Sequence, residues 1–176
     1  MLGGLGVESR PVRTAADLDE VDGLILPGGE STAMLRLMEP EDLGRLIGDR
    51  ITAGMPILAT CAGVILLAEN VEPEQACLGA LDVDVVRNAY GRQVHSSVEE
   101  VSVASGLGPS SSMEGVFIRA PIISRVGQAV EVLGKLGNDP VIVRQENLLG
   151  VTFHPELTSD HRVHELFVRM MEDRNG

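Results

Sequence analysis

The sequence predicts an α/β fold in one domain, with buried parallel strands, covering helices and some antiparallel strands in the middle of the chain. Short apolar runs alternate with longer stretches at helical spacing. The core must be aliphatic, because only 2% of the 176 residues are aromatic and tryptophan is absent. A chain of this length suits a single domain, which we expect to extend over residues 1–176.

The first strand–loop–helix unit is predicted around a pair of glycines. Leu24–Leu26 is a short buried strand, and Pro27–Thr32 follows it. Glycines in this loop allow the backbone to approach a ligand closely. We expect Ser31 or Thr32 to cap a helix over Ala33–Met38.

The second unit contains a cysteine at a sharp turn. After an amphipathic helix over Glu41–Ala53, the run Pro56–Ala59 predicts a buried strand, and a buried helix follows from Val64. Between them lies Thr60–Gly63, whose small residues allow a tight turn. A helix N-terminus favours a thiolate, so Cys61 is a candidate nucleophile. The alternative is an inert buried cysteine, since free cysteines are commonly buried.

The second half of the chain predicts mostly strands. Glu69–Gln75 is polar and is predicted to be a loop. Valine, leucine and isoleucine at strand spacing predict strands at Leu81–Val86, Val98–Val103, Gly115–Ile118, Val130–Leu133, Val141–Arg144 and Leu148–Phe153. A last amphipathic helix follows a cap at Ser159 or Asp160.

Composition excludes several classes of function. The net charge of −12 argues against nucleic-acid binding, which needs a basic face. Two cysteines are too few for a disulfide framework or a zinc cluster, so we expect a reducing, cytoplasmic setting. No apolar run approaches the ~18 residues that span a bilayer, and we expect no membrane partner.

Three loops follow three buried strands, namely Pro27–Ser31, Thr60–Gly63 and His154–Glu156. Loops at the carboxyl ends of parallel strands meet in one crevice. This placement predicts a triad of Cys61, His154 and Glu156. His154 would take the proton of the thiol and return it to the leaving amine, and Glu156 would fix the tautomer of the imidazole.

These stretches resemble the class I glutamine amidotransferases of the triad type, and more closely the glutaminase subunits of pyridoxal 5′-phosphate synthase (the PdxT/SNO family). The matching segments are VDGLILPGGEST (Val21–Thr32), TCAGVILLA (Thr60–Ala68), RNAYGRQV (Arg87–Val94), GVFIRAP (Gly115–Pro121) and GVTFHPELTSDHRVHELFV (Gly150–Val168).

The resemblance implies a fold and a set of site residues. The fold is three-layered and flavodoxin-like, with a mostly parallel central sheet. Cys61, His154 and Glu156 correspond to the catalytic triad. Backbone N–H groups of the Gly28-Gly29 loop and of Ala62 would stabilise the oxyanion. The positions that correspond to glutamine-binding residues are Gly29, Glu30, Ser31, Arg87, Ile118 and Arg119.

The resemblance also implies a reaction and a partner. L-Glutamine and water would give L-glutamate and ammonia through a thioester, with no metal or organic cofactor. The ammonia would pass to a separate (β/α)8-barrel synthase subunit that makes pyridoxal phosphate. The glutaminase is expected to be nearly silent until that subunit docks.

Two departures from the family pattern keep alternatives open. The family's first strand and helix, roughly twenty residues, have no counterpart before Val7, so we expect low stability or activity of this chain alone. Between Gln93 and Glu99 the family's aspartate is replaced by His95, which we expect to be solvated. The alternatives are a silent subunit that only docks on the synthase, a glutaminase serving another amidotransferase, and a cysteine peptidase or DJ-1-like protein.

Overall fold

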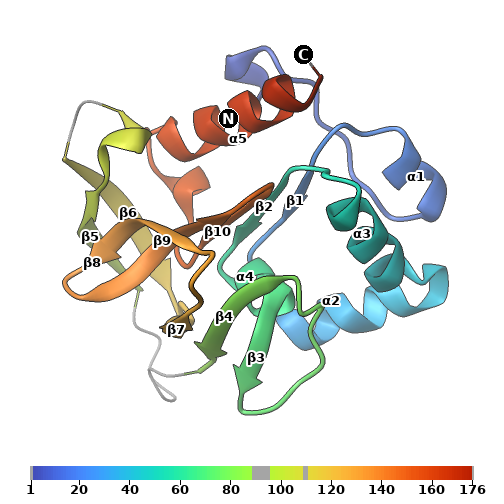
Figure 1. Cartoon of the computed structure of the whole chain (residues 1–176), viewed down its shortest axis with the longest axis horizontal. Helices are drawn as coiled ribbons and strands as arrows, with labels where there is room; N and C mark the ends of the chain where they lie inside the picture. Colours follow the sequence, from blue (N-terminus) through green and yellow to red (C-terminus); the bar gives the residue numbers. More distant parts are fainter. Residues whose placement is uncertain (1, 89–95, 109–110, 176) are drawn as a thin grey trace.

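A seven-stranded mixed sheet forms the centre of the computed structural model, which describes residues 2–88, 96–108 and 111–175 (Figure 1). In their order across the sheet, the strands are β1 (Leu24–Leu26), β2 (Ile57–Thr60), β10 (Leu148–Val151), β9 (Asp139–Gln145), β8 (Glu131–Leu136), β5 (Ser96–Val103) and β6 (Ser112–Ile118). Strands β1, β2 and β10 are parallel, and the other neighbouring pairs are antiparallel. The α/β class is therefore confirmed, with the parallel pairing confined to one side of the sheet.

Helices cover both faces of this sheet. The helices are α1 (Ala15–Asp19), α2 (Ser31–Met38), α3 (Leu43–Thr52), α4 (Ala62–Leu67) and α5 (Arg162–Asn175), and the short 3-10 turns are η1 (Leu2–Leu5), η2 (Glu39–Glu41), η3 (Ser105–Leu107) and η4 (Pro155–Leu157). Among the described residues, no helix is long and apolar enough to cross a membrane.

Alternation along β2 divides the buried residues into two clusters. Ile57 and Ala59 pack with residues of α1, α3 and α4, whereas Leu58 packs in a second cluster with Phe167 of α5. Successive side chains of a strand point to opposite faces, so this pattern places α5 on the face opposite to the other three helices. The three-layer arrangement predicted from the resemblance is thus confirmed (Figure 1).

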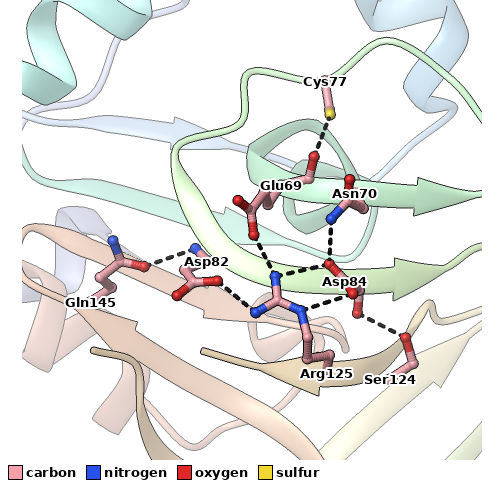
Figure 2. A network of polar contacts seen from close by, with 8 residues as sticks. All are labelled: Glu69, Asn70, Cys77, Asp82, Asp84, Ser124, Arg125 and Gln145. Carbon is pink, nitrogen blue, oxygen red and sulfur yellow. Dashed lines mark hydrogen bonds and ion pairs between the residues drawn. The ribbon is translucent and has the colours of Figure 1, made fainter. Parts of the chain in front are cut away.

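A smaller sheet of β3 (Ala68–Glu72), β4 (Leu81–Val86) and β7 (Ile122–Val126) contributes its buried residues to the first cluster. Its three strands are joined by Arg125, as Figure 2 shows. The guanidinium bonds Asp82 at 2.7 Å and Asp84 at 2.8 and 2.9 Å, and it also pairs with Glu69. Gln145 of β9 accepts from the backbone N–H of Asp82 at 2.8 Å, which ties the two sheets together.

Two predictions for local structure are wrong, and one lies outside the described residues. The polar stretch after α4, which was predicted to be a loop, begins with strand β3. Most of its side chains are exposed, so its sequence lacks the apolar alternation by which a strand is predicted. The cap of α2 is Glu30, not Ser31 or Thr32. His95, with most of the segment Arg87–Val94, falls among residues whose structure is not described.

Candidate active site

Cys61 lies at a strained turn between β2 and α4. Its φ of 48° and ψ of −106° are uncommon for a residue with a side chain. The backbone N–H of Cys61 donates to the carbonyl of Val151 in β10 at 2.8 Å. A Cβ at Gly63 would come within 2.1 Å of the carbonyl oxygen of Leu26, so only glycine allows α4 to approach β1 this closely. The sheet therefore fixes the turn on both sides.

The cysteine side chain is buried but is not enclosed by apolar groups alone. Only 6% of Cys61 is exposed. Its Sγ lies 3.9 Å from the carbonyl oxygen of Ile118 at the end of β6. The structure therefore places Ile118 next to Cys61, the candidate nucleophile.

His154 follows β10 and is fixed by two contacts. Its backbone N–H donates to the carbonyl of Val116 in β6 at 2.8 Å. Its Nδ1 lies 2.8 Å from Oε1 of Glu156, with 14% of the His154 side chain exposed. When Nδ1–H donates to the carboxylate, Nε2 is the ring nitrogen that remains free to exchange a proton with the sulfur of Cys61.

The electrostatics of His154 link it to both partners. A side-chain hydrogen bond with Cys61 is the main cause that raises the pKa of His154 to about 9, and the bond with Glu156 adds to it, while burial acts in the opposite direction. These two contacts therefore favour the protonated form of the imidazole.

The glycine pair of the first loop lies against the histidine ring. A Cβ at Gly28 would come within 2.4 Å of Cε1 of His154. Gly29 has a φ of 146°, a conformation that side chains disfavour. The structure therefore brings together the three loops that the sequence placed at one crevice.

Glu30 acts in the structure as a helix cap. Its carboxylate accepts from the backbone N–H groups of Thr32 at 3.2 Å and Ala33 at 2.9 Å. The hydroxyl and the N–H of Thr32 are the main groups that lower the pKa of Glu30, and the charge of Arg87 contributes. Glu30 is exposed, so capping leaves part of its carboxylate open to solvent.

Ser31 and Arg87 meet through a residue that sequence reasoning missed. The hydroxyl of Ser31 donates to Oε1 of Gln75 at 2.9 Å, and Nη1 of Arg87 donates to the same oxygen at 2.5 Å. Gln75 is one polar residue within a polar stretch, so no periodicity or motif distinguishes it. Arg119 is exposed and has a φ of 48° directly after Ile118.

Fold and site together define a class, the α/β proteins that present a cysteine at a strand–helix turn and a histidine–carboxylate pair after a neighbouring parallel strand. The model of the SNO glutamine amidotransferase family matches residues 2–173, and the chain belongs to this family.

Named relatives agree with this assignment. The chain is 48% identical over 174 residues to the pyridoxal 5′-phosphate synthase subunit PdxT of Fervidobacterium nodosum, covering 98% of this chain and 90% of that protein. It is 49% identical over 170 residues to the PdxT of Thermotoga maritima, covering 96% and 89%. A crystal structure of a glutamine amidotransferase superposes with a TM-score of 0.89 at 44% identity, covering 97% of this chain and 90% of that one.

Proposed function

We propose that this chain hydrolyses L-glutamine to L-glutamate and ammonia, as the glutaminase subunit of a pyridoxal 5′-phosphate synthase, with residues 1–176 acting as one glutaminase domain. The observation that carries the proposal is the 2.8 Å pairing of His154 Nδ1 with Glu156 Oε1, together with the interaction with Cys61 that raises the pKa of His154. Membership in the SNO family and the names of the PdxT relatives supply the substrate and the pathway.

The proposed reaction needs two steps at Cys61. The thiolate attacks the side-chain carbonyl carbon of glutamine, and protonated His154 gives its proton to the departing amine, so that ammonia leaves and a thioester remains. Neutral His154 then takes a proton from water, whose oxygen attacks the thioester. Glutamate leaves, and the thiolate and the protonated imidazole are restored. No electrons are transferred, and we propose no cofactor.

The backbone near Cys61 supports this chemistry. Ala62 and Gly63 begin a helix, whose N-terminal N–H groups and dipole favour negative charge at the substrate oxygen. The loop with Gly28 and Gly29 lies against His154, and its backbone N–H groups are a second set of candidate donors. We propose these two segments as the oxyanion-binding groups.

The polar groups at the N-terminus of α2 supply recognition of the amino-acid part of glutamine. We propose that Arg87 binds the α-carboxylate, because a guanidinium suits that group. The exposed part of the Glu30 carboxylate suits the α-ammonium. The further positions that we propose to contact glutamine are Gly29, Ser31, Ile118 and Arg119.

The product ammonia requires a recipient. We propose a (β/α)8-barrel synthase subunit as the partner and the cytoplasm as the compartment. Two free cysteines, Cys61 and Cys77, fit a compartment that keeps thiols reduced.

Glutamate release from L-glutamine tests the proposal, with the chain mixed with a pyridoxal phosphate synthase subunit. We expect release that depends on the synthase subunit and is abolished by Cys61→Ala. Cys77→Ala is the matched control and should keep full activity, because the hydrogen bond given for the Cys77 thiol among the described residues goes to the carbonyl of Glu69. Binding to the synthase without release would support a silent docking subunit and overturn the proposal.

A further inference from the structure

Gln75 connects two candidate glutamine-binding residues through one oxygen atom. It lies between β3 and β4, and its Oε1 accepts from Ser31 Oγ at 2.9 Å and from Arg87 Nη1 at 2.5 Å. Ser31 is 4% exposed and begins α2, whereas Arg87 follows β4 directly. Gln75 thus joins the first turn of α2 to the end of β4.

The guanidinium of Arg87 depends on Gln75 for its direction. The backbone of Arg87 is fixed, because its N–H donates to the carbonyl of Glu72 at 2.7 Å. The side chain is long and rotatable, and among the described residues Gln75 is its one hydrogen-bond partner. Glu30 acts on Arg87 through its charge, but its carboxylate is engaged in capping α2.

We infer that Gln75 is a positioning residue for glutamine binding, which directs Arg87 toward the N-terminus of α2 while leaving the charge of Arg87 available to the α-carboxylate. This inference rests on the proposed function. An amide oxygen accepts a hydrogen bond without carrying a charge, so it orients the guanidinium without neutralising it. A carboxylate at the same position would form an ion pair with Arg87 and repel the substrate carboxylate.

A second observation is that two donors in this group of side chains have no acceptor among the described residues. Nε2 of Gln75 and Nε of Arg87 are buried, and neither has an acceptor among the residues that the structure describes. Buried donors without acceptors cost free energy, and most are satisfied by protein, water or ligand. A carboxylate is an acceptor-only group and suits a pair of donors.

The test compares Gln75→Ala and Gln75→Glu, with the synthase subunit present, in steady-state kinetics with L-glutamine. For Gln75→Ala we expect KM to rise about tenfold with kcat within a factor of about two, since the loss is in substrate binding. For Gln75→Glu we expect a larger rise in KM. Glu74→Ala is the matched control, because Glu74 is the exposed neighbour and should leave KM unchanged.

A double-substitution cycle tests whether Gln75 acts through Arg87. In the background of Arg87→Ala, the change Gln75→Ala should add no further rise in KM. An additive effect would overturn the inference. A lower melting temperature with unchanged KM would also overturn it, because the role would then be structural, and a lower KM would show that Gln75 obstructs the site.

Calorimetric binding of L-glutamine to chains that carry Cys61→Ala gives the same comparison without turnover. If wild-type chain releases no glutamate but Gln75→Ala still weakens glutamine binding about tenfold, the proposed reaction fails and the positioning role stands. If the wild type is active and Gln75→Ala leaves binding unchanged, the positioning role alone is overturned.

Discussion

Gly28 shows how one missing side chain places a catalytic candidate. The imidazole of His154 packs on the backbone of Gly28. A Cβ added at residue 28 would lie 2.4 Å from Cε1 of the imidazole, which is too close for a normal contact. For Gly28→Ala we expect the ring to shift by about 1 Å and glutaminase activity to fall about 100-fold or more. Synthase-dependent glutamate release measures this loss.

Gly48→Ala is the control for that change. Gly48 lies inside α3, and a Cβ there meets nothing within 4 Å. Alanine is the better helix former, so this variant should keep full activity and unfold at a slightly higher temperature, with a gain of up to about 1 kcal/mol. Equal activity of both variants would contradict the packing of His154 on the Gly28 backbone.

The pKa of His154 predicts a pH dependence. Since His154 acts first as an acid in the proposed reaction, kcat/KM should fall as the pH rises through about 9, where the imidazole loses its proton. The contact with Cys61 and then that with Glu156 raise this pKa, so Glu156→Gln should move the falling limb to lower pH. Glu172→Gln, on the exposed end of α5, should leave the limb in place. If Glu156→Gln left the high-pH fall of kcat/KM where it is, the result would contradict the assignment of this fall to His154 paired with Glu156.

Residue identities could be predicted where a turn and a motif constrain them. Cys61 stands out because small residues surround it between a strand and a helix, and His154 and Glu156 because they follow a buried strand. Gln75 could not be found in this way, because its role depends on contacts with residues that are distant in sequence. Ser31 is 44 residues away and Arg87 is 12 residues away. Such contacts exist only once β3 and β4 are paired.

At the scale of elements, Arg125 stabilises the small sheet by serving all three of its strands. Arg125→Met removes the cation and leaves Glu69, Asp82 and Asp84 as uncompensated neighbours. We expect a lower melting temperature that recovers in part with added salt, because salt screens the repulsion. The pKa of Asp84, now lowered chiefly by its bond with Arg125, should rise in the variant.

Arg45→Met offers a matched comparison. Arg45 also pairs with two carboxylates, Asp42 and Asp49, but all three belong to one helix and its cap and are well exposed. Exposed pairs within a helix contribute little. Thermal unfolding should therefore change much less than with Arg125→Met, and equal changes would show that Arg125 does not tie strands together.

The elements themselves were predictable to different degrees. β4 lies at Leu81–Val86, as alternation predicts, and the buried pattern of its residues explains why the signal is clear. In β3 only Ala68 is fully buried. The conformation of this strand is therefore set by its pairing with β4 and not by its own composition. The antiparallel strands near the middle were expected, but their place in the same sheet as β1, β2 and β10 depends on long-range pairing.

At the scale of the whole molecule, burial is concentrated in two neighbouring strands. All residues of β2 and of β10 are buried, and the two strands pair in parallel in the sheet interior. We expect their amide hydrogens to exchange most slowly, and those of β3, which is largely exposed, to exchange much earlier. Hydrogen–deuterium exchange with mass spectrometry measures this order, and faster exchange of β2 than of β3 would contradict it.

The position of β1 bears on self-association. Within the described part of the chain, β1 ends the large sheet and is only three residues long. Pro27 follows it directly and has no N–H group to offer, so the ladder cannot extend. A short border of this kind gives another molecule few backbone groups to pair with, which limits edge-to-edge aggregation. The same loop that brings Gly28 to His154 thus also limits pairing with another molecule at the β1 edge.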